Sequence, residues 1–108
     1  MKLDTGAEIE KTAVLANLKK ITNQIFKLLP NREENIDWET PLATIVEELS
    51  GMDKVLSAYH GTLFALLCKL NGLYELRSDD DFFSYRRTIF ECLNLLSTLK
   101  GEIEACQE

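Results

Sequence analysis

The fold follows from a pattern that the stretch FFSYRRTIFECLNLLSTLKGEIEAC, residues 82–106, carries through its whole length. Steps of three and four residues alternate between its apolar positions Phe82, Tyr85, Ile89, Cys92, Leu96, Leu99, Ile103 and Cys106. Such spacing keeps side chains on one face of an α-helix. Further large apolar residues lie off this line, at Phe83, Phe90, Leu93 and Leu95. We therefore expect this helix to be central in a bundle or covered by another subunit.

An upstream stretch shows the same spacing and predicts a first helix. It should begin near Asp4 or Thr5, which are competent N-caps, and end at Pro30. Its buried stripe is expected at Val14, Leu18, Ile21, Ile25 and Leu28. Residues 30–35 are polar and predict a connection that ends around residues 36–38.

The next helix has two possible starts and a long apolar stripe. Either Asp37 or Thr40 can be its N-cap, and Pro41 is tolerated in both cases. A glycine costs a helix interior roughly 1 kcal/mol against alanine, and Gly51 and Gly61 both interrupt the stripe. We expect a break near Gly61, with Thr62 capping the following piece, and a second break near Gly51. The stripe itself runs through Leu42, Ile45, Leu49, Met52, Leu56, Tyr59, Leu63, Leu66, Leu70 and Leu73.

The polar run at residues 77–81 is predicted to end that segment and to cap the last helix. Ser78 and the acids Asp79, Asp80 and Asp81 are good N-cap residues, and negative charge is favourable at a helix start. A calcium loop would need further ligands at alternating positions, where Phe82 and Phe83 stand instead. The acids are therefore interpreted as a cap.

Length and composition bound the class of protein. The 108 residues are 45% apolar and 28% charged, which predicts one domain over residues 1–108. Together with the helical pattern this predicts an all-α, compact, up-and-down bundle of four or five helices. The net charge of −6 makes direct nucleic-acid binding unexpected. The polar N-terminus and the absence of a long apolar run predict a cytoplasmic chain without a membrane span, in which Cys68, Cys92 and Cys106 are free thiols.

Residue patterns that carry catalysis or bind cofactors were not found. His60 is the only histidine, and no acid and nucleophile can be matched to it. The three cysteines lack the short spacing of a zinc site, and no glycine-rich phosphate loop occurs. We therefore expect a protein that is not an enzyme and holds no metal or cofactor.

Two groups of residues are candidate binding sites. Tyr85, Arg86 and Arg87 combine a ring with two guanidinium groups that can bind a carboxylate or phosphate. The alternative is that both arginines pair with Asp79–Asp81, Glu91 or Glu47. Trp38 can anchor a partner, or else cover the end of the core together with Ile36.

The apolar excess of residues 82–106 predicts a homodimer, because two-fold pairing is the commonest way for a soluble chain to bury such a surface. Phe83, Phe90 and Leu95 are the residues expected in that contact, or else in the core.

The chain resembles small uncharacterised helical proteins carried by prophages of Gram-positive bacteria. The resemblance covers about residues 20–96 and lies in LLPNREE at 28–34, DWE at 37–39, ELSGM at 48–52 and YRRTIFECL at 85–93. It implies no activity and no site residues. It implies a context in which short acidic proteins bind host machinery, or sequester small signalling nucleotides.

Two functional hypotheses follow. The first is a binding protein, such as a phage or mobile-element regulator or inhibitor of host machinery, whose acidic residues Glu47, Glu48 and Asp79–Asp81 engage a basic protein. The second is a bundle that binds a nucleotide or another anion with Arg86, Arg87 and neighbouring rings.

Overall fold

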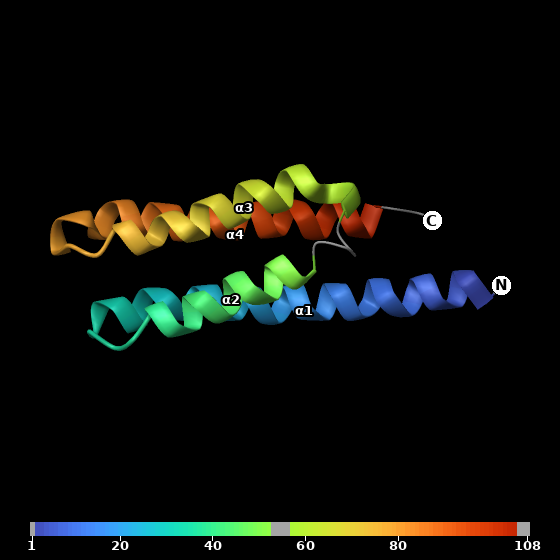
Figure 1. Ribbon diagram of the computed structural model, residues 1–108, viewed down its shortest axis with the longest axis horizontal. Coiled ribbons are helices and arrows are strands. Elements are labelled where there is room, and N and C mark those ends of the chain that lie inside the picture. The colour runs from blue at the N-terminus through green and yellow to red at the C-terminus, as the bar shows by residue number, and fades with distance from the viewer. Residues whose placement is uncertain (1, 53–56, 106–108) are drawn as a thin grey trace.

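The computed structural model describes residues 2–52 and 57–105, and the side chains of 12–52 and 58–105. These residues form an all-α bundle with four helices (Figure 1), which are α1 (Lys2–Glu33), α2 (Glu39–Gly51), α3 (His60–Gly72) and α4 (Phe82–Ala105). Three short 3₁₀ turns accompany them, η1 (Ser57–Tyr59), η2 (Leu73–Glu75) and η3 (Asp79–Asp81). The fold class predicted from the sequence is confirmed.

The helices run up and down, each antiparallel to the next (Figure 1). α1 packs on α2, α2 on α3, α3 on α4, and α4 back on α1, so that the four helices enclose one core. The connections α1–α2 and α3–α4 lie at the same end of the bundle, which we call the loop end. The bundle measures 54 × 22 × 17 Å.

The predicted stripes form the core. Buried residues from all four helices and from η2 make one cluster, which consists of Val14, Leu18, Ile21, Ile25, Leu28, Leu42, Ile45, Leu49, Leu63, Leu66, Leu70, Leu73, Tyr85, Ile89, Cys92, Leu96, Leu99 and Ile103. Leu56 and Cys106, also expected in the stripes, lie outside the described residues. In the parts of the chain that are described, no helix is long and apolar enough to cross a membrane.

The end of α1 corrects one prediction. The helix does not stop at Pro30 but continues for almost one further turn to Glu33. Asn35 ends it instead, with a left-handed φ of 59°. The Ile36 amide donates to the Asn31 carbonyl (2.7 Å) and the Asn35 amide to the Arg32 carbonyl (3.3 Å), which is the Schellman arrangement. Pro30 lies in the last turn of α1, where its missing N–H removes one hydrogen bond and the other hydrogen bonds of the turn still form. The helix therefore tolerates the proline.

The start of α2 supports Asp37 over Thr40 as the capping side chain. Asp37 Oδ1 accepts hydrogen bonds from the amides of Glu39 (3.0 Å) and Thr40 (3.2 Å). Hydrogen bonds from the Thr40 side chain and backbone lower the pKa of Asp37 below its usual value. Pro41 then falls inside the first turn of α2, where its missing N–H costs nothing.

The long middle stripe belongs to two antiparallel helices rather than one kinked helix. α2 ends at Gly51, as the expected second break allows, and α3 begins at His60. The residue that precedes α3 is Tyr59, so Thr62 lies inside α3 and is not its cap. Thr62 Oγ1 instead donates to a Glu102 carboxylate oxygen on α4 (3.2 Å).

In the polar run before α4, the capping side chain is Ser78, whereas the predicted cap residues Asp79–Asp81 form the 3₁₀ turn η3 and, among the described residues, make no side-chain cap hydrogen bond. Ser78 Oγ accepts a hydrogen bond from the Asp80 amide (3.2 Å), and the Asp81 amide donates to the Ser78 carbonyl (2.9 Å). η3 then leads directly into α4 at Phe82.

Candidate functional site

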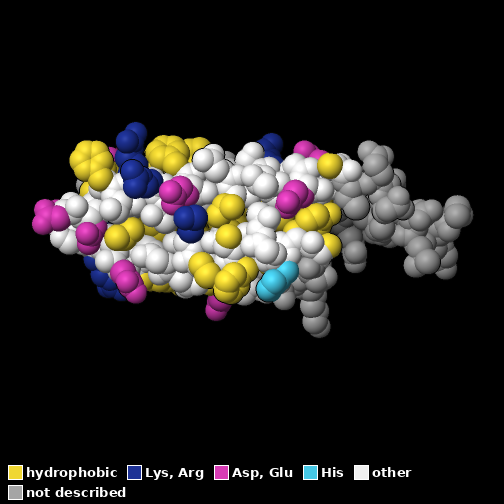
Figure 2. Space-filling model, turned by 90° about the horizontal axis from the view of Figure 1, so that it is seen from above, with side chains coloured by type: hydrophobic (Ala, Val, Ile, Leu, Met, Phe, Trp, Pro, Cys, Tyr) yellow, Lys and Arg dark blue, Asp and Glu magenta, His cyan; other side chains and the backbone are white. Residues whose placement is uncertain are grey.

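The side of α4 that points away from the core carries two aromatic rings and two arginines. Phe83 is 81% exposed and Phe90 is 42% exposed, and Arg86 and Arg87 are exposed beside them. Phe83, Ser84, Arg86, Arg87 and Phe90 line a shallow pocket of about 370 Å³. Figure 2 looks down on α3 and α4 and shows ring-shaped apolar side chains on both sides of basic ones, near the loop end. We call this surface, with its continuation along α4, the α4 outer face.

No carboxylate of the described residues neutralises the arginines of this face. The Arg86 guanidinium lies 5.4 Å from the centre of the Phe90 ring, a cation–π contact. Among the described residues, neither Arg86 nor Arg87 forms an ion pair, and Glu91 pairs with Lys69 on α3 (3.0 Å). The alternative in which both arginines pair with nearby acids is therefore not observed. The positive charge of the face stays available to a partner.

Tyr85 does not belong to this face, which corrects the prediction that groups it with Arg86 and Arg87. Its side chain is fully buried on the core side of α4, and its hydroxyl donates to the Leu28 carbonyl of α1 (3.4 Å). Burial raises the pKa of Tyr85 well above its usual value. Tyr85 is a core residue that a ligand on the outer face does not reach.

Leu95 and Trp38 also lie away from Phe83 and Phe90. Leu95 follows Glu91 by one turn on the side of α4 that faces α3, and it packs partly buried against the core. Trp38 covers the core at the loop end and meets Tyr85 edge to face, with ring centres 5.1 Å apart. Of the four residues predicted for a partner or dimer contact, the structure places only Phe83 and Phe90 on one exposed surface.

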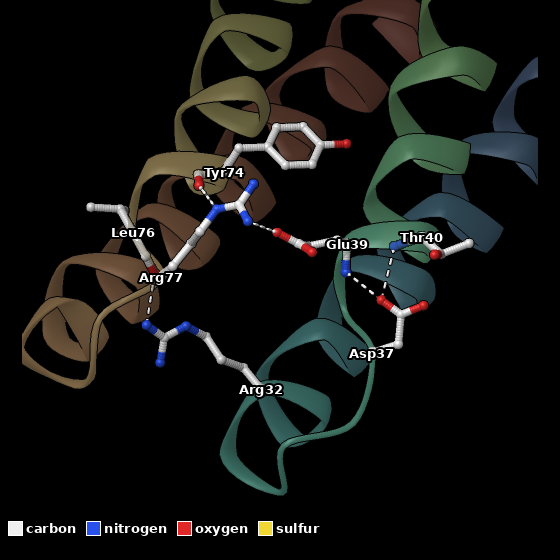
Figure 3. A network of polar contacts seen from close by, with 7 residues as sticks. All are labelled: Arg32, Asp37, Glu39, Thr40, Tyr74, Leu76 and Arg77. Carbon is white, nitrogen blue, oxygen red and sulfur yellow. Dashed lines mark hydrogen bonds and ion pairs between the residues drawn. The ribbon is translucent and has the colours of Figure 1, made fainter.

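The loop end contains a cluster that sequence patterns did not predict (Figure 3). Arg32, in the last turn of α1, reaches across to the α3–α4 connection, where its Nη2 donates to the carbonyls of Leu76 (2.6 Å) and Ser78 (2.8 Å). The same guanidinium lies over the rings of Tyr85 (4.6 Å) and Phe82 (5.5 Å). We call these contacts the Arg32 clasp. No short-range signal could have found it, because the bonded residues are 44 and 46 positions apart in sequence.

A cleft of about 260 Å³ lies beside the clasp. Arg77 crosses it to Glu39, with Nη1 and Oε2 2.6 Å apart, and joins the α3–α4 connection to the start of α2 (Figure 3). The lining residues carry three carboxylates against two arginines, and consist of Arg32, Asn35, Ile36, Asp37, Trp38, Glu39, Arg77 and Asp79. Most of these charged groups already contact one another or the backbone. The cleft therefore offers a charged ligand fewer available partners than the α4 outer face does.

The acidic residues named in the first functional hypothesis do not form one surface. Asp79–Asp81 are at the loop end, whereas Glu47 and Glu48 lie on α2 about 12 Å further along the bundle. The Glu48 carboxylate also lies 3.7 Å from Lys20 Nζ.

The nucleophilic and metal-binding side chains are dispersed. Within the described ranges, no three His, Cys, Asp or Glu side chains come close enough together to hold a metal ion. His60 stacks on Phe64 at 5.9 Å between ring centres, on α3. Cys92 is in the core, where burial raises the pKa of its thiol to about 12, and Cys68 is exposed.

No protein-family model matches the chain, and no curated protein or solved structure matches it either. Function is therefore inferred from the geometry of the α4 outer face.

Proposed function

We propose that this protein is not an enzyme and that it acts by binding a protein partner through the α4 outer face. The observation that carries the proposal is Phe83, an aromatic side chain 81% exposed beside two arginines that have no ion pair among the described residues. Aromatic residues, phenylalanine included, and arginines are enriched at the cores of protein interfaces, and arginine is also frequent among the residues that contribute most binding energy. Among the described residues, the one cation–π contact within this group is that of Arg86 with the Phe90 ring.

The chemistry of the face defines the partner. Two guanidinium groups favour carboxylates, and the rings on either side of them favour an apolar or aromatic anchor. A nucleic acid would meet Arg86 and Arg87 but also the acidic remainder of a chain with net charge −6. An acidic, partly apolar protein surface fits better than a nucleic-acid backbone.

We place this activity in the cytoplasm, because a chain with free thiols suits a reducing compartment. The resemblance to prophage-carried proteins adds a host protein as the proposed partner, and a lysate of a Gram-positive bacterium as the first place to search.

Affinity capture with matched variants tests the proposal. The wild-type chain, Phe83→Asp, Arg87→Glu and Phe64→Asp are immobilised and exposed to the same lysate. Phe64 is the control because it is another exposed phenylalanine, 58% exposed, on α3. We expect a partner that wild type and Phe64→Asp retain, that both α4 variants lose, and that high salt weakens. Equal capture by all four chains would contradict the proposal.

The pocket between the two rings also supports a second candidate function, the binding of an aromatic anion such as a nucleotide. Its volume of about 370 Å³ lies in the range of small-molecule sites, and Arg86 and Arg87 line it. A nucleotide that binds there should raise the midpoint of thermal unfolding, and Arg86→Ala should abolish the rise. A rise that persists in Arg86→Ala would place the nucleotide elsewhere.

A further inference from the structure

We infer that, in the free protein, the α4 outer face also pairs with a second copy of this chain, packed antiparallel to the first about a two-fold axis at Asn94. This inference rests on the proposed function, because it uses the same binding face. Three properties of α4 carry it, namely its distribution of side-chain size, its distribution of charge, and a glycine that the monomer does not require.

Side-chain size is divided between the two halves of the face. The positions that point away from the core follow one line along α4 and are all exposed, at Phe83, Arg87, Phe90, Asn94, Thr98, Gly101 and Ala105. Their spacing is symmetric about Asn94, with large residues before it and small residues after it. Antiparallel pairing centred on Asn94 therefore places Phe83 over Ala105, Arg87 over Gly101 and Phe90 over Thr98 of the other copy. Large side chains then fill the space left by small ones.

Gly101 is unexplained by the packing of a single chain. It lies within α4, where glycine is the poorest helix former apart from proline. A Cβ placed on it would meet no atom within 4 Å, so nothing in the monomer requires a glycine there. A glycine here would allow a helix of the second copy to approach closely, with Arg87 of that copy extending across the position.

Charge is divided in the same way and selects the orientation. Arg86 and Arg87 lie in the first half of α4, and Glu102 and Glu104 lie in the second half. None of the four forms an ion pair among the residues that the structure describes. Antiparallel pairing brings the arginines of one copy to the glutamates of the other, whereas parallel pairing would place like charges together.

α1 adds a further apolar side chain to the same surface. Lys20 and Asn31 mark the side of α1 that contacts α2 or the residues just before it. Phe26 lies on the opposite side, toward α4, and is half exposed. The hydrogen bond between Tyr85 and Leu28 places these two residues at similar positions along the bundle axis. Because α1 and α4 are antiparallel, Phe26 then lies beside the turn of α4 from Arg86 to Phe90. A second copy on the α4 outer face would cover it.

The size of the contact sets its strength. The line from residue 83 to 105 is about 33 Å long and a helix is about 11 Å wide, which gives a footprint of about 360 Å² per copy before the flanks are counted. Stable interfaces bury about 800 Å² per partner. We therefore expect a weak dimer that dissociates on dilution, with a dissociation constant in the micromolar range or above.

Cysteine cross-linking tests both the dimer and its orientation, in a Cys68→Ser, Cys106→Ser background. In Asn94→Cys the two introduced cysteines face each other across the axis, and mild oxidation should link the copies. In Thr98→Cys antiparallel pairing separates them by about 12 Å along the helices, beyond the Cα separation of about 4.4–6.8 Å that a disulfide spans. We expect efficient linkage at position 94 and several-fold less at position 98. Equal linkage at both positions would indicate parallel pairing and overturn the inference.

Sedimentation and charge reversal supply the second measurement. The mass of the unmodified chain should rise toward that of a dimer between about 1 µM and about 500 µM. Arg87→Glu should lower the dimer fraction several-fold, and adding Glu102→Arg should restore it. A monomer at every concentration, without linkage at position 94, would overturn the inference. The proposed function is tested separately by lysate capture, and it fails if Phe83→Asp leaves the capture unchanged. A monomer whose α4 outer face binds another protein would therefore disprove only the self-pairing.

Discussion

At the scale of single residues, Arg32 is the least ordinary position in the bundle. A buried cation is normally matched by a carboxylate, because removing a charge from water is costly. Arg32 is 9% exposed and has two backbone carbonyls and two aromatic rings as its contacts. Its Nε is buried without a hydrogen-bond partner among the described residues. The stabilisation it supplies therefore depends on Nη2, which makes both hydrogen bonds, and on the flat guanidinium surface over the two rings.

Replacing Arg32 tests that dependence. We expect Arg32→Ala to lower the free energy of unfolding by about 2–4 kcal/mol, because it removes two charge-assisted hydrogen bonds and two cation–π contacts. Arg32→Lys should recover only part of this loss, since an ammonium lacks the planar surface that lies over the two rings. Arg77→Ala is the matched control and should cost less than about 1 kcal/mol, because its ion pair with Glu39 is largely exposed. Urea denaturation measures all three, and equal losses for Arg32→Ala and Arg77→Ala would contradict the clasp.

Alkaline pH should destabilise the bundle through Cys92 and then through Tyr85. The pKa of Cys92 is raised from 9.0 in the unfolded chain to about 12 in the fold. Between these values the unfolded thiol ionises and the folded one does not, so stability present below pH 9 is lost as the pH rises. The expected slope is up to about 1.4 kcal/mol per pH unit for each such group. Urea denaturation at several pH values above about 8 measures the slope, which Cys92→Ser should flatten.

At the scale of elements, the periodic stripes were predictable and the helix ends were less so. Steps of three and four residues report burial directly, and all the described stripe positions except Met52, Tyr59 and Phe82 are buried. Pro30 was interpreted as a stop from local chemistry alone. The stop depends on Asn35 adopting a left-handed conformation, which many sequences permit and few require. The same stripe also spans α2 and α3, because the periodicity keeps its phase across a reversal of the chain.

Substitutions at Asn35 test how α1 ends. With φ at 59°, Asn35→Gly removes the strain of a side chain in left-handed backbone and should raise the free energy of unfolding by up to about 1 kcal/mol. Asn35→Val should lower it by about 1–2 kcal/mol, because a β-branched residue resists this conformation. Thermal unfolding followed by circular dichroism measures both variants. A valine variant as stable as the glycine variant would show that α1 ends in another way.

At the scale of the whole molecule, sequence patterns predicted an all-α bundle but not the arrangement of its candidate sites. Arg86 and Arg87 were predicted as a ligand site, and Phe83 and Phe90 as part of a dimer contact, whereas the structure brings all four together around one pocket. Tyr85 was wrongly added, since adjacency in sequence places a residue about 100° away on a helix. The Arg32 clasp was not predicted because it depends on the end of α1 meeting the α3–α4 connection. That meeting is determined by the core that all four helices share and not by the local sequence of either part.

One core shared by four helices should unfold in a single step. Because α1 packs on α4 and α2 on α3, neither hairpin can lose its partner and keep its apolar side covered. Trp38, in contact with Tyr85, reports on the loop end, whereas circular dichroism reports on all helices. We expect both signals to give one midpoint and one slope in urea. Separate midpoints would show that the two hairpins unfold independently.

The Arg32 clasp has a consequence for mutational tolerance. Its acceptors at positions 76 and 78 are main-chain oxygens, which every amino acid supplies. The clasp therefore constrains the residue that donates and leaves the side chains of the residues that accept unrestricted. The side chain of Leu76 is constrained only by its packing against the core, and that of Ser78 only by its role as a cap. In a scan of all single substitutions, position 32 should accept arginine almost alone, and positions 76 and 78 should each reject residues for unrelated reasons.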